Sequence, residues 1–313
     1  MSTFLVTGAT GRQGGPTARL LLAKGAKVHA LVRDPDSPAS QALRSLCATL
    51  FKGDFDDTAA ITAAMKGVNG VFLNPYPSFT DPNYEIATAQ KFVDIARTAG
   101  TVTSFVVSTS VVVSTFEVNY SSDASSVQAD YPFVSAYYAS KAGIENAVRA
   151  SGFTYTILRP GWLMHNYIGE QTKFSWPGYN ETRVLTTSYP PDFRLGHLDP
   201  ADVGQFAAAA LLDPARFAGK EIQLVHDWVT VGELAAHLSE AIGVEVKVKY
   251  RTEEESAAMR KQLPTVEVQL WKPTVKNLDD SAELASYRFH LTTLKEFLEK
   301  EKVAVKKTVG IEA

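Results

Sequence analysis

The sequence predicts an α/β fold, a Rossmann-type doubly wound parallel sheet with a smaller α/β C-terminal domain that binds the substrate. Two observations predict it. An apolar run at residues 3–7 breaks at once into a glycine-rich turn at residues 8–15. Apolar runs and helical segments then alternate five times with short links. Such alternation is typical of parallel strands joined by crossover helices.

The first turn has the context of a dinucleotide-binding loop. Residues 3–7 predict a buried strand, and residues 17–24 predict a helix. Gly8 lets the chain turn sharply, Gly11 lets the backbone approach a pyrophosphate, and Gly14 lets helix and strand pack closely. The phosphates would meet free N–H groups and the positive end of the helix dipole. The spacing is Gly-x-x-Gly-x-x-Gly, so a purely structural turn is the alternative.

The next part of the chain predicts the rest of the sheet. Expected strands lie at residues 26–32, 48–52, 68–73, 102–108 and 153–158. Expected helices lie at residues 38–47, 57–66, 82–99 and 137–150. Because such sheets bind ligands at the carboxyl ends of their strands, we expect the residues there to gather at one site. These residues are Gly8, Arg33, Asp54, Asn74 and Ser110.

The end of the second strand predicts which nucleotide binds. An acidic residue there favours NAD, whereas an arginine accommodates the 2′-phosphate of NADP. Arg33 and Asp34 are adjacent, and Arg33 directly ends the apolar run, so we predict NADP(H). Arg12 is a second candidate for a phosphate, and Asp54 is a candidate for the adenine edge. The alternative is that Arg33 and Asp34 are solvated charges of a turn.

Tyr137 and Lys141 are the candidate acid–base pair. They lie four positions apart, so they share one face of the predicted helix. A tyrosine hydroxyl has a reference pKa of about 10, and a nearby ammonium group lowers that value. Ser110 is the candidate that orients the substrate oxygen while a proton and a nicotinamide hydride are exchanged. The alternative is an aromatic ring packed under a lysine stem on an ordinary helix.

Two later stretches are candidates for binding the substrate. Residues 111–135 form a long link, for which a lid or a substrate loop is expected. Aromatic residues crowd among prolines between residues 164 and 197. An aromatic wall would suit a flat or polycyclic carbonyl compound, and the core of a small domain is the alternative. The candidate pocket residues are Trp162, His165, Tyr167 and Trp176. His165 and His197 are also candidate acids, although a lone histidine is more often structural.

The C-terminal part predicts further helices at residues 199–212, 230–242, 253–262 and 291–300, and strands at residues 220–225 and 244–250. Thr230 and Glu233 have the spacing of a capping box. The end of the chain is charged and aperiodic, for which a partly disordered tail is expected. The predicted NADP-binding domain spans residues 1–158 plus 199–226, the substrate-binding domain residues 159–198 plus 227–302, and the tail residues 303–313.

Composition narrows the class of protein. The 313 residues are 45% hydrophobic with a net charge of −3, which allows a large core and predicts no nucleic-acid binding. The single cysteine, Cys47, allows no disulfide within the chain and suits a reducing compartment. The sequence predicts no signal peptide and no membrane span, so we expect a cytoplasmic protein that binds no membrane. No histidine has metal-ligand spacing, so no metal is expected. A homodimer is left open.

Several motifs resemble those of the NmrA-like, atypical branch of the short-chain dehydrogenase/reductases. They are the glycine loop at residues 8–15, LVRDP at residues 31–35, residues 137–141, and ILRPG at residues 157–161. The resemblance covers most of residues 3–230 and implies NADP binding, with Ser110 and Tyr137 as the catalytic serine and tyrosine. Taken together, the predicted nucleotide contacts are Gly8, Thr10, Gly11, Arg12, Gln13, Gly14, Arg33, Asp54, Asn74, Lys141, Pro160 and Trp162.

Many proteins of this branch carry another residue in place of Tyr137, and some are redox-sensing regulators. This chain keeps Ser110, Tyr137 and Lys141 together, which favours catalysis. We therefore predict an NADPH-dependent reductase of a carbonyl group on a small aromatic or polycyclic metabolite. The alternatives are an NADP(H)-sensing regulatory or interaction protein without turnover, and an enoyl or imine reductase on the same fold.

Overall fold

The computed structural model describes residues 1–78, 80–113, 129–275 and 281–312. The chain separates into two compact units, each built from three stretches of sequence. The first unit consists of Met1–Ser114, Tyr137–Pro160 and Pro200–Leu224. The second consists of Thr115–Ala136, Gly161–Asp199 and Val225–Ala313. Which unit binds the nucleotide and which the substrate stays a prediction.

The first unit contains a seven-stranded sheet in the order β10-β6-β5-β4-β1-β2-β3, in which all neighbours are parallel. Its strands are β1 (Thr3–Val6), β2 (Lys27–Val32), β3 (Thr49–Lys52), β4 (Gly70–Leu73), β5 (Ser104–Ser108), β6 (Thr154–Pro160) and β10 (Lys220–Leu224). Strands β2 and β3 lie on one side of β1, and strands β4, β5, β6 and β10 lie on the other. This order confirms the doubly wound parallel sheet that the sequence predicts.

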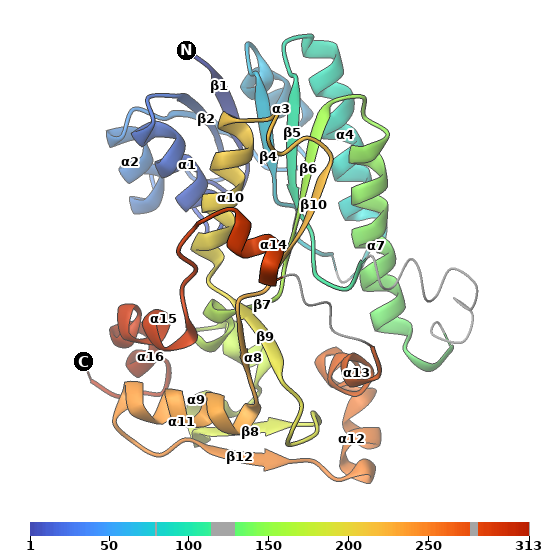
Figure 1. The fold of residues 1–313 in the computed structure, drawn as a ribbon, viewed down its shortest axis with the longest axis vertical. Coiled ribbons are helices and arrows are strands. Elements are labelled where there is room, and N and C mark those ends of the chain that lie inside the picture. The colour runs from blue at the N-terminus through green and yellow to red at the C-terminus, as the bar shows by residue number, and fades with distance from the viewer. Residues whose placement is uncertain (79, 114–128, 276–280, 313) are drawn as a thin grey trace. The chain divides into compact units, whose positions relative to one another are not determined.

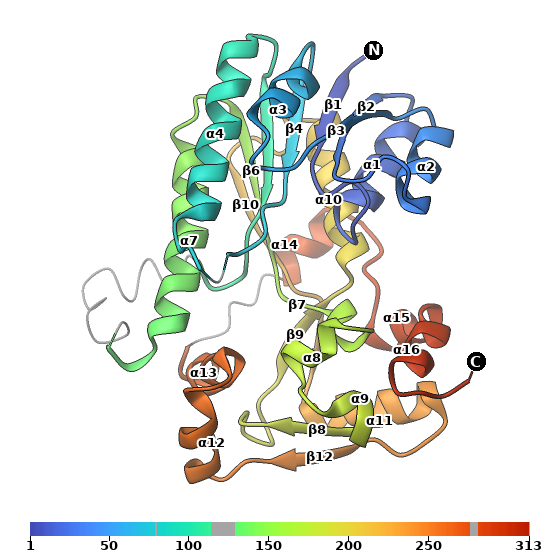
Figure 2. The same ribbon diagram turned by 180° about the vertical axis from the view of Figure 1, so that it is seen from behind.

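Helices cover both faces of this sheet (Figures 1 and 2). They are α1 (Gly14–Ala23), α2 (Pro38–Ser45), α3 (Thr58–Met65), α4 (Tyr84–Ala99), α7 (Pro132–Arg149) and α10 (Pro200–Leu212). The helices α3, α4 and α7 bury Ile61, Phe92 and Ile144 in one apolar cluster against the sheet. On the other face α10 packs directly against α1. The first unit therefore has three layers, helix, sheet and helix.

Helix ends follow the local chemistry of the sequence. The side chain of Asp57 accepts a hydrogen bond from the N–H of Ala60 at 2.9 Å and so caps α3. Helix α4 ends at Gly100, whose φ of 69° is left-handed. Because the helices end close to the strands that follow them, the links are short. The carboxyl ends of the parallel strands therefore lie at the same edge of the sheet.

The second unit contains a three-stranded sheet in the order β11-β9-β7 and a two-stranded sheet of β12 and β8. Its strands are β7 (Trp162–Leu163), β8 (Val184–Thr187), β9 (Leu195–Leu198), β11 (Asp227–Val229) and β12 (Lys247–Tyr250). Its helices are η1 (Met164–Tyr167), α8 (Gln171–Ser175), α9 (Tyr179–Thr182), α11 (Val231–Ile242), α12 (Glu253–Arg260), α13 (Pro264–Trp271), η2 (Lys272–Thr274), α14 (Ser281–Ser286), α15 (Leu294–Lys300) and α16 (Lys302–Thr308). The predicted capping box at Thr230 and Glu233 begins α11.

Some expectations differ from the structure. The end of the chain is not a disordered tail, because α16 buries Val305, and Val309 directly after this helix is buried in the same core of the second unit. Helix α7 begins at Pro132 rather than at Tyr137, since proline suits the first turn of a helix. The expected lid at residues 111–135 falls largely on residues 114–128, which lie outside the described residues.

The contact between α10 and α1 depends on a glycine. A Cβ atom added at Gly204 would lie 2.6 Å from Cβ of Pro16 and 2.8 Å from the backbone nitrogen of Thr17. Gly204→Ala should therefore force the helices apart and lower the free energy of unfolding by about 1–3 kcal/mol. Urea unfolding measures this loss.

Gly232 provides the matched control. It is also helical, but the nearest atom to its added Cβ is 3.7 Å away. Gly232→Ala should stabilise the chain by about 0.5–1 kcal/mol, because alanine restricts the unfolded backbone more than glycine does. Equal effects of the two substitutions would contradict the packing argument.

Candidate functional site

The glycine-rich turn makes a tight bend at the end of β1. Gly8 has a φ of 58°, in the left-handed region that L side chains rarely adopt. Its carbonyl accepts a hydrogen bond from the N–H of Gly11 at 2.8 Å. A Cβ atom added at Gly14 would lie 2.4 Å from the carbonyl oxygens of both Thr7 and Gly8. Only glycine therefore allows α1 to begin this close to β1.

The N-terminus of α1 suits an anionic ligand. No side chain caps this end of the helix, at Gln13, and no acidic residue lies in its first turn. Thr10, Gly11 and Arg12 are exposed just before it. The amide groups of a helix N-terminus and the helix dipole both favour a phosphate. The residues present therefore fit the pyrophosphate of a dinucleotide.

Asn74 lies beside this turn, directly after β4. Its backbone N–H donates a hydrogen bond to Oγ1 of Thr7 at 2.9 Å. A Cβ atom added at Gly8 would lie 3.9 Å from Nδ2 of Asn74. The winding of the sheet reverses between β1 and β4, which is where open α/β sheets bind their ligands. The structure thus brings Gly8 and Asn74 together at that point.

Two aspartates that follow neighbouring strands accept hydrogen bonds within their own turns. Oδ1 of Asp34 accepts a hydrogen bond from the N–H of Asp36 at 2.9 Å. Oδ1 of Asp54 accepts one from the N–H of Asp56 at 2.9 Å. Asp34 is therefore already hydrogen-bonded at the position where an acid would hold the ribose of NAD. Arg33, which precedes it, is exposed.

The candidate acid–base pair lies together on α7. Nζ of Lys141 is 5.2 Å from the centroid of the Tyr137 ring. Tyr137 is half-buried, and its ring packs edge-on against Tyr138. Lys141 is buried, and its ammonium donates a hydrogen bond to Oε1 of Glu85 at 2.6 Å. The lysine therefore meets both the tyrosine ring and a carboxylate from α4.

Glu85 is a residue that the sequence analysis missed. It lies in the first turn of α4, it is only 2% exposed, and its second oxygen accepts a hydrogen bond from Oγ of Ser140 at 3.0 Å. A clue was present in the sequence. Glu85 shares a helix face with Thr88 and Ala89, which are buried. A carboxylate on a buried face needs a buried cation, and Lys141 is that cation.

Three hydroxyl groups follow one another at the end of β5. Ser108 and Thr109 are buried, and Ser110 is half-buried. Oγ of Ser108 has no hydrogen-bond partner among the described residues. Oγ1 of Thr109 donates to Oε1 of Glu145 at 2.7 Å. Of the three side chains, that of Ser110 is the one a ligand can reach most easily.

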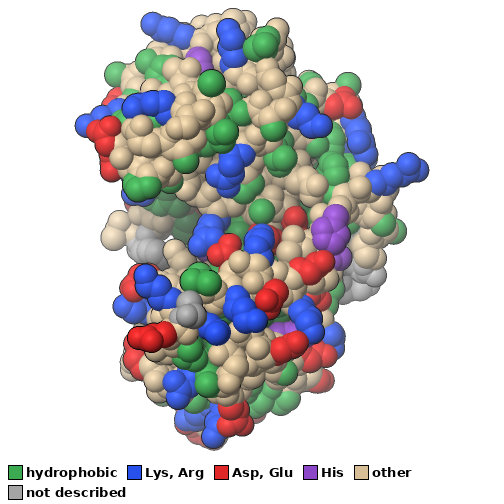
Figure 3. Space-filling model, turned by 90° about the vertical axis from the view of Figure 1, so that its left-hand side faces the viewer, with side chains coloured by type: hydrophobic (Ala, Val, Ile, Leu, Met, Phe, Trp, Pro, Cys, Tyr) green, Lys and Arg blue, Asp and Glu red, His purple; other side chains and the backbone are tan. Residues whose placement is uncertain are grey.

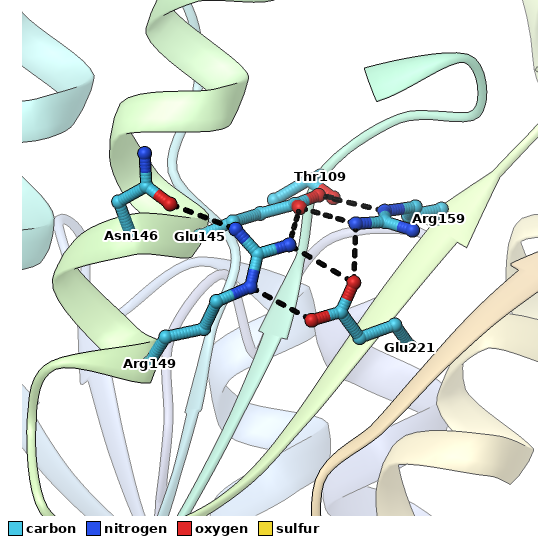
Figure 4. Close-up of polar contacts among 6 residues, drawn as sticks. All are labelled: Thr109, Glu145, Asn146, Arg149, Arg159 and Glu221. Atoms are coloured by element: carbon cyan, nitrogen blue, oxygen red, sulfur yellow. Dashed lines mark hydrogen bonds and ion pairs between the residues drawn. The ribbon is translucent and has the colours of Figure 1, made fainter. Parts of the chain in front are cut away.

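Glu145 is the centre of a buried ion network (Figure 4). It accepts hydrogen bonds from Nε and Nη2 of Arg159 at 2.9 and 2.6 Å, and both side chains are buried. Arg149 also donates to Glu145 at 2.9 Å, and both arginines contact Glu221. These residues come from α7, β6 and β10. The network therefore ties the helix of the candidate acid–base pair to the edge of the sheet.

The network shifts the pKa of two of its members. Hydrogen bonds from Arg149 lower the pKa of Glu221 below its ordinary value. Burial alone would lower the pKa of Arg159, but the hydrogen bond and charge of Glu145 outweigh it and raise that pKa. Both groups are thereby held in their charged forms.

The candidate pocket residues lie in the second unit. Tyr167 and Trp176 are fully buried in its core, whereas Trp162 and His165 are half-buried. The rings of Trp162 and Trp176 meet edge to face, with centroids 6.4 Å apart. Tyr167 and Trp176 thus take the alternative position considered above, the core of a small domain. Trp162 and His165 keep part of their surface exposed, and their role in binding a substrate stays a prediction.

His197 is a structural residue of the same core. Its Nδ1 lies 2.7 Å from the carbonyl oxygen of Leu195, which can only accept, so Nδ1 carries the proton. Its Nε2 then accepts a hydrogen bond from the hydroxyl of Tyr167 at 2.6 Å. Burial lowers the pKa of His197 to about 4 and raises that of Tyr167 well above its ordinary value. Neither group exchanges protons near neutral pH.

Positive and negative side chains are intermixed on the face that Figure 3 shows. In the described ranges, no group of three or more His, Cys, Asp or Glu side chains could hold a metal ion. Among these residues, too, no helix has the length and apolar character needed to cross a membrane.

Breaking the central ion pair should be costly. Glu145→Gln leaves the guanidinium of Arg159 buried without its main counter-charge, so the free energy of unfolding should fall by about 3–5 kcal/mol. Glu240→Gln is the control, because Glu240 pairs with Lys295 at 2.9 Å on the exposed surface and should change stability little. Urea unfolding compares the two, and a loss for Glu145→Gln as small as that of the control would contradict the role of the network.

The buried histidine makes stability depend on pH. Folding lowers the pKa of His197 to about 4, and unfolding returns it to about 6.5. Below that value the unfolded chain binds a proton that the folded chain does not. Stability present above about pH 6.5 is therefore lost as the pH falls towards 4, by roughly 1 kcal/mol per pH unit.

His197→Gln should remove this contribution, because glutamine stays neutral. The measurement is the difference in unfolding free energy between about pH 7 and about pH 5.5, above the range in which most carboxylates titrate. His290→Gln is the control, since His290 is exposed, and it should keep the full difference. An unchanged difference in His197→Gln would contradict the assignment.

The chain resembles two oxidoreductases in sequence. The "NmrA-like family domain-containing oxidoreductase notA'" of Aspergillus versicolor is 31% identical over 253 residues, which cover 74% of this chain and 67% of that protein. Quinone oxidoreductase 2 of Escherichia coli K12 is 27% identical over 262 residues, which cover 82% and 81%.

Solved structures share the fold. NmrA, described as a negative transcriptional regulator, has in complex with NAD a TM-score of 0.75 at 20% identity, with 99% of this chain and 98% of that chain covered. The E. coli NADPH-dependent quinone oxidoreductase in complex with NADPH has a TM-score of 0.70 at 24% identity, covering 95% and 99%. A model of the NmrA-like family matches residues 1–298, and the chain therefore belongs to the NmrA-like family.

Proposed function

We propose that the chain is an NADPH-dependent oxidoreductase that reduces a carbonyl group on a small aromatic or polycyclic metabolite. The observation that carries the proposal is the uncapped N-terminus of α1 behind the Gly8–Gly14 turn, beside Asn74 at the point where the sheet reverses. Two relatives that are named oxidoreductases support the enzyme class. The proposal therefore joins a nucleotide site to a redox reaction.

The choice of NADPH over NADH rests on Arg33. This exposed arginine ends β2, and Asp34, the acid that would favour NAD, is hydrogen-bonded within its own turn. An arginine there accommodates the 2′-phosphate. Structures of NmrA are described as complexes with NAD and with NADP, and that of the quinone oxidoreductase as a complex with NADPH. These complexes agree with a nucleotide of this kind.

When bound, NADPH supplies a hydride to the carbonyl carbon. The residues of the chain act on the oxygen. Tyr137 donates the proton, so that the C=O group becomes an alcohol, and Ser110 donates a hydrogen bond that orients the oxygen. Lys141, with Nζ 5.2 Å from the Tyr137 ring centroid, favours the negative charge left on the tyrosine. It would also hold the nicotinamide ribose when the cofactor is bound.

The name of quinone oxidoreductase 2 suggests where to begin the search for a substrate. A quinone is a flat ring with two carbonyl groups, so it has the shape and the chemistry that the proposal requires. Half-buried Trp162 and His165 are candidates to contact such a ring.

The proton donor can be tested by removing one hydroxyl group. Tyr137→Phe should lower kcat by about 10²- to 10⁴-fold, the usual contribution of a positioned acid, and should leave the dissociation constant of NADPH unchanged. The measurement is NADPH oxidation with a panel of quinones and aromatic ketones, repeated with NADH. Tyr138→Phe is the matched control, because it removes the same group one position along the helix.

Each outcome of this experiment has a consequence. If Tyr137→Phe turns over a genuine substrate as fast as the unaltered chain, the proton comes from another group, as in an enoyl or imine reductase. If the chain binds NADPH tightly but reduces no carbonyl compound, it is a nucleotide-sensing regulatory protein. A preference for NADH would overturn the role given to Arg33.

A further inference from the structure

Lys141 and Glu85 form an ion pair that is closed off from solvent. Nζ of Lys141 and Oε1 of Glu85 lie 2.6 Å apart, and the two side chains are 5% and 3% exposed. Both views of the fold show α4 and α7 side by side on one face of the sheet (Figures 1 and 2). They approach closely, because a Cβ atom added at Gly143 would lie 2.5 Å from Cδ1 of Ile86. This approach lets the short glutamate side chain reach the lysine.

The carboxylate of Glu85 is held by more than the lysine. Its Oε2 accepts a hydrogen bond from Oγ of Ser140 at 3.0 Å. Glu85 also lies in the first turn of α4, where the helix dipole favours negative charge. Both oxygens are therefore engaged, and the position of the anion is set by two helices.

Within the described ranges, Glu85 is the one carboxylate that pairs with the ammonium of Lys141. A buried ammonium is costly unless a charge of opposite sign lies beside it. The ring of Tyr137, at 5.2 Å, offers a cation–π contact, which is weaker than a desolvated ion pair. The position of the Lys141 ammonium therefore depends on Glu85.

We propose that Glu85 is the positioning residue of the acid–base pair. It holds the ammonium of Lys141 in place beside the ring of Tyr137, so that the cation stays within reach of the phenol. Ser140 supports Glu85 in this position. The inference rests on the proposed function for its catalytic meaning, but the coupling of Glu85 to Lys141 can be tested without it.

The first test is a double-mutant cycle on stability. Glu85→Gln and Lys141→Met each leave one buried charge without its partner, so each should lower Tm. The double variant buries no unpaired charge, so its loss of Tm should be smaller than the sum of the two single losses. Glu240→Gln, in an exposed ion pair with Lys295, is the control and should leave Tm unchanged. Losses that add would overturn the pairing.

The second test asks whether Glu85 acts through Lys141 in function. Glu85→Gln should lower kcat by about 10²-fold, the scale of a misplaced catalytic group, with KM for the carbonyl substrate unchanged. In the Lys141→Met background the same substitution should cause no further loss of kcat. Glu85→Asp, which keeps the charge, should restore part of the rate. Equal fold-losses in both backgrounds would show a merely structural role and overturn the proposal.

The two failures can be told apart. If no carbonyl compound is reduced, the proposed function fails, and the inference is decided by the Tm cycle together with the dissociation constant of NADPH, measured by quenching of tryptophan fluorescence. The change in this dissociation constant in the double variant should be smaller than the sum of the changes in Glu85→Gln and Lys141→Met. If carbonyl reduction is observed but both cycles are additive, the proposed function stands and the role of Glu85 falls.

Discussion

The buried ion pair of Glu145 and Arg159 is the constraint on which the first unit depends. Two charges removed from water are tolerated only where good geometry and further hydrogen bonds compensate their lost hydration. Thr109 and Arg149 supply those bonds, so the end of β5, strand β6 and helix α7 are joined at one point. Glu145 follows Lys141 by one helical turn. The pair therefore fixes the position of α7 on the sheet, and with it the position of the candidate acid–base residues.

Glu85 repeats this arrangement on the neighbouring helix. Both glutamates are buried on the inward faces of their helices, and each meets a cation from a different element. Such breaks in an amphipathic pattern are expected at functional sites, where the fold accepts a local cost to place charge. Two buried carboxylates thus hold α7 from two sides, one towards the edge of the sheet and one towards α4.

Much of this architecture could be predicted because it is encoded locally. The glycine turn, the buried strands and the spacing of Tyr137 and Lys141 are properties of short segments, and the family resemblance that they suggested is confirmed. The partners of Lys141 and Arg159 could not be predicted, since periodicity shows that Glu85 is buried but not against what. Aromatic residues such as Trp176 are ambiguous for a similar reason: a pocket wall and a core require the same side chains. The placement of Ser110 relative to Tyr137 depends on tertiary structure and stays a prediction.

The close packing of α10 on α1 has a consequence for synthesis on the ribosome. The glycine turn and α1 emerge first, but the surface that covers α1, around Gly204, is translated only after two of the three stretches of the second unit have been made. The nascent first unit must therefore remain with one side of α1 uncovered, exposed to chaperones and to misassembly. A truncation before residue 200 would leave this side permanently open, so a shortened version of the first unit would need a different design rather than a simple cut.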